Sequence, residues 1–207
     1  MSYDIYLKER VSGETIQLPV KHVMTGGTYQ ADYDPVTHTF SPAAIQEAWL
    51  NITYNYGHYY YEATDGDPRF AHDEVSAYYA DGTKGPMQTE YGIRGIYGKS
   101  GAESIPMLKD MLARIEQKYK VNGEWISTDR EKRRYLDVKT RKELDFWKDI
   151  LDKHLPEDAY VVEEYTVSVN EGPNEDYWEP TAANAMKPLW QLIAFAELRP
   201  DGVWDGD

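Results

Sequence analysis

The sequence predicts an α+β fold with a mainly helical core, an N-terminal β-hairpin and one or two further short strands. Apolar side chains recur at helical spacing in four segments of the 207-residue chain. β-Branched and aromatic residues gather in short runs near both ends. Hydrophobic residues make up 41% of the chain, enough for a folded core. We expect a single domain over residues 1–207, with possible insertions at 63–90 and 120–172.

The first elements follow from local signals. Residues 2–9 and 14–22 are rich in Ile, Tyr, Val and Leu and flank a glycine turn, which predicts a β-hairpin. Ser41 is a good N-cap, and the apolar stripe from Ile45 to Tyr60 predicts an amphipathic helix after it. Two turn clusters within 63–90 predict an excursion there.

Three further helices and a strand are expected in the second half. Ser104 can cap a helix that continues to about residue 119. Thr128 begins a capping-box pattern with a Glu three residues later, which predicts a helix to about residue 155. Residues 160–169 favour a strand. Residues 181–198 are apolar on most faces and predict a helix inside the core.

Composition excludes several classes of protein. The chain has no cysteine, so disulfides and thiolate chemistry are ruled out. It has no apolar run long enough to cross a membrane, and its start lacks the pattern of a secretory signal, so we expect a cytoplasmic protein that does not bind membranes. The net charge is −14, and residues 154–207 carry −10 of it. Direct binding of nucleic acid is therefore not expected.

The distribution of charge along the chain also suggests a role for its most basic stretch and for its most acidic part. Residues 130–142 form the one strongly basic stretch of the sequence, and it could pair with the acidic last third. Alternatively, the last third could mimic DNA and occupy the basic nucleic-acid site of a host enzyme.

A glycine-rich loop precedes the second helix and is the first candidate site. Backbone N–H groups of Gly98, Lys99, Ser100 and Gly101 could hold an anion, with Arg94 nearby. The spacing of a nucleotide-binding phosphate loop is not met. An ordinary helix entry is the alternative interpretation of this loop.

Tyrosine is unusually frequent, with 18 residues, many of them between positions 54 and 61. A tyrosine combines apolar area with a polar tip, so Tyr54 and Tyr61, together with His58, are candidates for contact with a partner. His58 and Glu62 are four apart, and His72 follows, which leaves a metal-assisted hydrolase as an alternative. No metal-binding signature accompanies them, so we assign no metal and no cofactor.

Segments 2–7, 47–56, 95–106 and 199–207 resemble a group of small proteins from phages and prophages of Gram-positive bacteria. The resemblance implies an origin in a mobile element and carries no activity or site residue with it. The middle of the chain, about 120–172, departs from the pattern.

These observations favour a non-enzymatic acidic binding protein of phage origin. It would engage a host protein or a small molecule through the Tyr-rich helix and the Gly-rich loop. The DNA mimic and the metal-assisted hydrolase are the alternatives, and the oligomeric state is left open.

Overall fold

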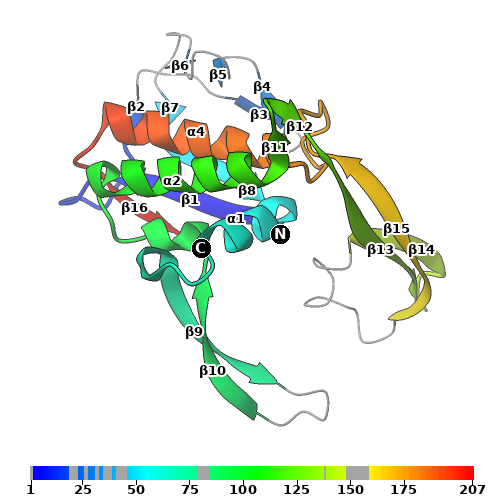
Figure 1. The fold of residues 1–207 in the computed structure, drawn as a ribbon. Helices are drawn as coiled ribbons and strands as arrows, with labels where there is room; N and C mark the ends of the chain where they lie inside the picture. The colour runs from blue at the N-terminus through cyan, green and yellow to red at the C-terminus, as the bar shows by residue number, and fades with distance from the viewer. Residues whose placement is uncertain are drawn as a thin grey trace.

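A computed structural model gives the fold in Figure 1. It describes residues 2–18, 23–25, 28–30, 33–34, 39–40, 46–78, 84–137, 139–147 and 159–207.

The core has two layers, a sheet and a layer of helices. The sheet is antiparallel, in the order β16-β1-β8, with β1 (Ser2–Lys8) between β8 (Trp49–Thr53) and β16 (Val203–Gly206). The helices are α1 (Gly57–Thr64), α2 (Gly101–Tyr119) and α4 (Ala182–Leu198). The two long helices, α2 and α4, lie side by side against the sheet (Figure 1).

Alternating burial explains the central strand, and caps explain the long helices. Tyr3, Ile5 and Leu7 are buried on the helix side of β1, while the residues between them are half-buried. Ser100 and Glu103 form a capping box at the start of α2. The side chain of Thr181 caps α4, which is buried on most of its faces.

Two β-structures project from this core (Figure 1). The first is the hairpin of β9 (Ala71–Tyr78) and β10 (Lys84–Tyr91). The second is a three-stranded antiparallel sheet in the order β14-β13-β15, made of β13 (Ser127–Asp137), β14 (Lys142–Trp147) and β15 (Ala159–Asn170). The hairpin overlaps the stretch 63–90, and the three-stranded sheet lies inside 120–172, the two stretches that the sequence marks as possible insertions.

Short elements complete the described chain. The 3-10 turns are η1 (Tyr54–Tyr56), η2 (Pro68–Phe70) and η3 (Ile93–Ile96). The short strand pairs are β2 (Gln17–Leu18) with β7 (Gln46–Glu47), β3 (Val23–Thr25) with β4 (Thr28–Gln30), β5 (Tyr33–Asp34) with β6 (Thr39–Phe40), and β11 (Lys120–Val121) with β12 (Glu124–Trp125). No helix in the described ranges is both long and apolar enough to span a membrane.

The expectation of a mainly helical core is wrong, because strands hold more of the described residues than helices do. The first expected helix is instead strand β8, turn η1 and the short helix α1, and Ser41 lies outside the described residues. Ala48, Leu50 and Ile52 are fully buried at a spacing of two, which is the period of a strand. Pairing with β1 fixes this conformation.

The third expected helix is also wrong. The segment from Thr128 forms β13 and β14, and residues 148–158 lie outside the described ranges. The Thr128 hydroxyl donates to the carboxylate of Glu171 instead of capping a helix. Arg130 and Lys132, two apart on β13, both lie over the ring of Trp147. This spacing places them on one face of a strand.

The remaining expectations agree more closely with the structure. The strand at 160–169 and the helix at 181–198 are confirmed as β15 and α4. The second helix is confirmed but begins at Gly101, one turn before the expected cap at Ser104. Among the described residues, the N-terminal hairpin is formed near its turn, where Ile16 N donates to the Leu7 carbonyl, and residues 19–22 lie outside the described ranges. The main partners of β1 are β8 and β16.

Candidate functional site

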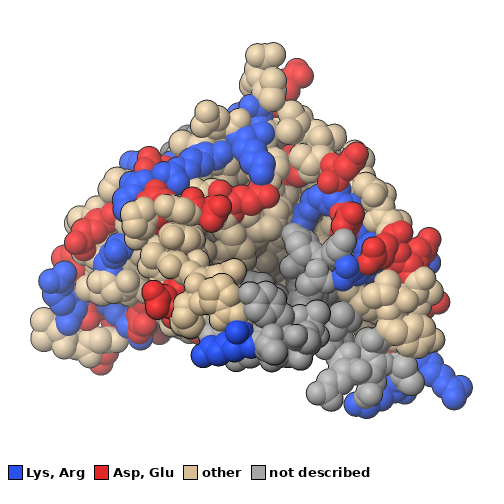
Figure 2. All heavy atoms as spheres, turned by 60° about the horizontal axis from the view of Figure 1, so that its bottom comes forward, with Lys and Arg blue, Asp and Glu red and all other residues tan. Residues whose placement is uncertain are grey.

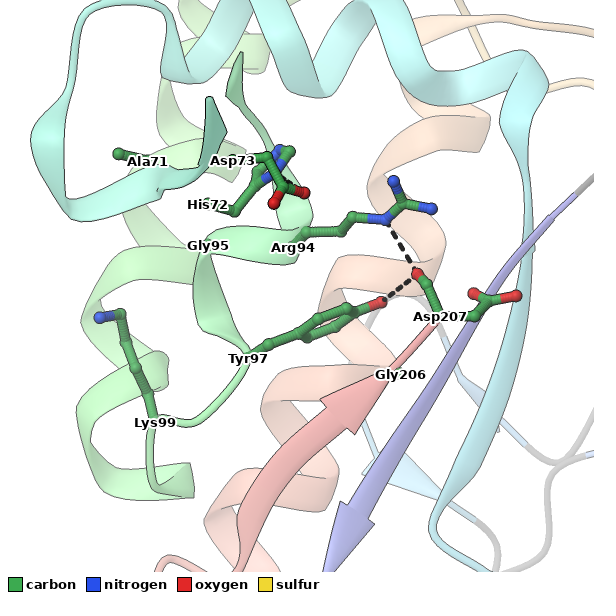
Figure 3. A pocket seen from close by; sticks show the side chains of 9 residues that line it. All are labelled: Ala71, His72, Asp73, Arg94, Gly95, Tyr97, Lys99, Gly206 and Asp207. Carbon is green, nitrogen blue, oxygen red and sulfur yellow. Dashed lines mark hydrogen bonds and ion pairs between the residues drawn. The ribbon is translucent and has the colours of Figure 1, made fainter. Parts of the chain in front are cut away.

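A polar pocket of about 450 Å³ opens where the hairpin leaves the core. Its lining comes from the start of β9, from η3 and the loop after it, and from the end of β16 (Figure 3). The lining residues are Ala71, His72, Asp73, Arg94, Gly95, Tyr97, Lys99, Gly206 and Asp207.

Arg94 is held in this pocket by hydrogen bonds on two sides. Its Nε donates to the main-chain oxygen of Asp207 at 2.9 Å, and its Nη2 donates to the hydroxyl of Tyr54. The Tyr97 hydroxyl reaches the same Asp207 oxygen at 3.4 Å, so Arg94 and Tyr97 converge on the end of β16 (Figure 3). The guanidinium is therefore fixed in position.

A cluster of three tyrosines supports the same arginine. The rings of Tyr3 and Tyr54 lie 4.2 Å apart, and the Arg94 guanidinium carbon lies 5.4 Å and 5.7 Å from their centroids. The hydroxyls of Tyr3 and Tyr61 are 2.9 Å apart. A cation over aromatic faces is attracted to their π-electrons, so the cluster stabilises Arg94 in its pocket position.

The hydroxyls around Arg94 are protonated at neutral pH. Burial raises the pKa of Tyr54 and of Tyr97 above the ordinary value of a tyrosine, against the opposing effect of the Arg94 charge. Burial also raises the pKa of Tyr3. These groups therefore act as neutral hydrogen-bonding partners.

The Gly-rich loop does not present free N–H groups to an anion. Gly98 N donates to the Trp204 carbonyl and Lys99 N to the Ile96 carbonyl. Ser100 N donates to the Glu103 carboxylate and Gly101 N to the Gly202 carbonyl. All four N–H groups thus have protein acceptors, and the loop serves to dock the start of α2 on β16. Of these four residues, Lys99 lines the pocket, and its amine points away from Arg94 (Figure 3).

His58 lies elsewhere, on the side of α1 that faces β13. Its ring packs on Tyr59 with centroids 3.7 Å apart, and its Nδ1 is 3.4 Å from Nη2 of Arg130. Burial, followed by the charges of Arg130 and Lys118, holds the pKa of His58 well below its ordinary value. His58 is therefore a half-buried residue between α1 and β13 that is neutral at pH 7.

The structure does not group His58, Glu62 and His72. The Glu62 carboxylate accepts hydrogen bonds from Lys118 at 2.7 Å and from the Tyr119 hydroxyl at 2.6 Å, both on α2. His72 lies instead in the Arg94 pocket.

The acidic last third is partly neutralised within the molecule. Arg133 pairs with Glu164, and Arg134 pairs with Glu163 at 2.9 Å, as the charge pattern suggests. Glu171 is fully buried. Basic and acidic side chains alternate on the face in Figure 2, which does not present one continuous acidic surface. These contacts remove carboxylates from a DNA-like array.

The chain matches no known protein family, curated protein or solved structure. Function is therefore inferred from the geometry of the pocket.

The sequence indicates Arg94, Lys99, Tyr54 and Tyr61 as candidates but does not indicate other residues that the structure brings to Arg94. Tyr3 joins the tyrosine cluster through the pairing of β1 with β8. Asp207 reaches Arg94 because β16 pairs with β1. Neither pairing has a signal in local periodicity, because the paired segments lie far apart in the sequence.

Proposed function

We propose that this protein is a non-enzymatic binding protein that holds a small acidic molecule in the Arg94 pocket. The observation that carries the proposal is the fixed guanidinium of Arg94 on the wall of a polar pocket. Of the two expected partners, a host protein and a small molecule, this proposal selects the small molecule.

Arg94 retains donors for a ligand. An arginine has five N–H groups. Within the described residues, those of Arg94 engage the Asp207 oxygen and the Tyr54 hydroxyl. The remaining N–H groups can form a paired hydrogen bond with a carboxylate or phosphate. Because the side chain is already ordered, binding costs less conformational entropy than it would for a free arginine.

The pocket limits the size and chemistry of the ligand. Its volume of about 450 Å³ falls in the usual range for small-molecule sites. His72 and Lys99 add polar groups, while the acidic side chains of Asp73 and Asp207 also line it. A ligand with both an anionic group and a hydroxyl or amine donor would satisfy these two kinds of lining.

The serine hydroxyls at the start of α2 are engaged within the protein and do not line the pocket. The Ser100 hydroxyl donates to Glu103, and the Ser104 hydroxyl donates to the Gly101 carbonyl and accepts from Trp204. Neither is placed as an activated nucleophile beside the pocket.

Small-molecule capture tests the proposal. Purified protein is mixed with heat-cleared bacterial extract and desalted, and the molecules released on denaturation are identified by mass spectrometry. We expect the wild-type protein to retain one acidic compound. The retained amount should be at least tenfold lower for Arg94→Gln, and it should also be reduced for Arg94→Lys. Lys109→Gln removes one positive charge as well, from an exposed ion pair between Lys109 on α2 and Glu197 on α4. This variant should retain the compound fully.

Two controls make the outcome decisive. Near-ultraviolet circular dichroism checks that Arg94→Gln keeps the native packing, and Lys99→Gln provides a second pocket variant. Retention of no acidic compound, or equal retention by Arg94→Gln, would overturn the proposal. Capture of a basic nucleic-acid-binding protein that high salt releases would favour the DNA mimic instead.

A further inference from the structure

The base of the β9–β10 hairpin brings together three side chains that can bind a metal. His72, Asp73 and Glu90 each offer one ligand atom, and these atoms all lie within 4.8 Å of one another. Asp73 pairs with Glu90 across the two strands, and Ala71 pairs with Tyr91. The register therefore leaves His72 as the extra residue of a β-bulge.

The bulge explains why His72 and Asp73 can act together. Successive side chains of a regular strand point to opposite faces. A bulge re-aims one side chain, and bulges are frequent next to functional sites. Here His72 Nδ1 lies 3.4 Å from Asp73 Oδ2, although the residues are neighbours in the chain.

His72 itself is buried and incompletely satisfied. Its side chain is 8% exposed. Its Nε2 is a buried atom without a hydrogen-bond partner in the described part of the chain. Buried polar atoms are normally paired, so an imidazole nitrogen of this kind calls for an explanation. A bound cation, with the water molecules that complete its shell, would provide one.

The two carboxylates need a positive partner as well. Directly opposed like charges on paired strands destabilise a hairpin. Among the described residues, neither Asp73 nor Glu90 forms an ion pair with a lysine or arginine. The Asp73 side chain is 63% exposed, which gives a cation an open route to the site.

We propose that His72, Asp73 and Glu90 bind one divalent transition-metal cation, of which Zn²⁺ is the first to test. One imidazole and two carboxylates suit Zn²⁺, Mn²⁺ or Co²⁺ better than Mg²⁺ or Ca²⁺, which prefer oxygen ligands alone. Ligand atoms about 2.1 Å from a tetrahedral zinc lie about 3.4 Å apart. Small rotations of the exposed carboxylate can close the present separation.

The proposed metal site does not require the acidic ligand proposed above, because its three side chains form a group without Arg94. His72 and Asp73 nevertheless line the same pocket. Three protein ligands leave a coordination position of zinc for water or another small ligand.

Cobalt and zinc titrations of the untagged, chelator-treated full chain test this proposal. Co²⁺ bound to imidazole and carboxylate absorbs visible light, so the titration reports direct coordination. We expect one Co²⁺ per chain, displaced by one Zn²⁺, with at least tenfold weaker binding in Asp73→Asn and in Glu90→Gln. Calorimetry with Zn²⁺ alone should give the same order of affinities.

Glu74→Gln is the matched control, because Glu74 is exposed on β9 opposite Thr89 and lies outside the group of three. It should bind Co²⁺ as the wild type does. His72→Gln should abolish the visible spectrum, and the exposed Asp73 variant keeps the test valid if the buried change unfolds the hairpin. Absence of stoichiometric binding, or equal loss in Glu74→Gln and Asp73→Asn, would overturn the proposal and indicate adventitious binding to surface acids.

Discussion

Glu171 joins the three-stranded sheet to the helical layer, and its removal gives the sharpest test of the fold. The side chain is fully buried. Its carboxylate accepts hydrogen bonds from the Tyr59 hydroxyl of α1 at 2.6 Å, from Ala182 N of α4 at 2.8 Å and from the Thr128 hydroxyl of β13. Ala182 is the first residue of its helix, where the helix dipole also favours a negative group.

The effect of Glu171→Ala can be worked out bond by bond. Tyr59 has a second acceptor in the Pro180 carbonyl at 2.5 Å, so its hydroxyl stays paired. Ala182 N loses its acceptor in the interior, at about 1–3 kcal/mol, and the half-buried Thr128 hydroxyl loses a charged acceptor at a smaller cost. The vacated volume adds a further cost. We therefore expect a loss of about 3–5 kcal/mol in the free energy of unfolding.

Glu171→Gln keeps the shape and separates charge from packing. The amide oxygen can still accept from Ala182 N, and the amide nitrogen can donate to the Thr128 oxygen. Hydrogen bonds to a charged group contribute about 1.5–3 kcal/mol, against about 1 kcal/mol for neutral pairs. The expected loss is about 1–2 kcal/mol, smaller than that of the alanine variant.

Equilibrium unfolding in urea, followed by tryptophan fluorescence and circular dichroism, measures both losses. Combining Glu171→Ala with Thr128→Val gives a double-mutant cycle, and a coupling energy above about 1 kcal/mol is expected for the direct hydrogen bond. Glu164→Gln, an exposed member of the same sheet paired with Arg133, should change stability by less than about 1 kcal/mol. If Glu171→Gln were as stable as the wild type, the reasoning that these contacts favour a negative carboxylate would be refuted.

Two other perturbations test the contacts of His58, outside the pocket, and of Gly95, in its wall. His58 has a pKa well below its ordinary value, so the unfolded state binds a proton below about pH 6.5 that the folded state does not. Stability should therefore fall as the pH falls, and between pH 7 and pH 5 the wild type should lose more than His58→Gln, by at most about 2 kcal/mol; equal losses in urea unfolding would contradict this. In Gly95→Ala, the new Cβ would lie 2.4 Å from the Phe70 Cα, which forces η3 away from η2. We expect about 2–3 kcal/mol of destabilisation by thermal denaturation, and an unchanged midpoint would show that the two turns separate freely.

Local signals in the sequence predict the elements whose conformation is decided locally. The side chain of Thr181 is an N-cap, and α4 is apolar on most of its faces, so the pattern does not match a strand. Residues 160–169 are rich in β-branched and aromatic side chains, and they extend along β13 as β15. In both cases, local preference and tertiary contacts agree.

Ambiguous patterns explain the failures. Ala48 and Ile52 fit a helical stripe four apart and a strand face at the same time, and the fully buried Leu50 between them decides for the strand. Thr128 and Glu131 match a capping box, but the Thr128 hydroxyl is taken by Glu171, more than forty residues later. Long-range pairing thus overrides propensity, as it does most strongly for strands.

Part of the candidate site could likewise be predicted from the sequence, and part of it could not. Arg94 could be found because it stands beside a conspicuous Gly-rich loop, yet the reason for its importance could not. That reason is the support from Tyr3 and Asp207, at opposite ends of the chain, which β1 and β16 bring together. The proposed metal ligands depend on a bulge at His72 that shifts the register of one hairpin. Composition does not encode such a shift.

The pocket takes its lining from both the core and the hairpin. The core provides Arg94 and Asp207, whose places depend on the central sheet, whereas the hairpin provides His72 and Asp73 from its first residues. Among the described residues of the hairpin, only the first three of β9 line the pocket. Contacts at the base of a hairpin are held by the core from which it leaves. The pocket and the proposed metal ligands therefore depend on residues that the core keeps in place.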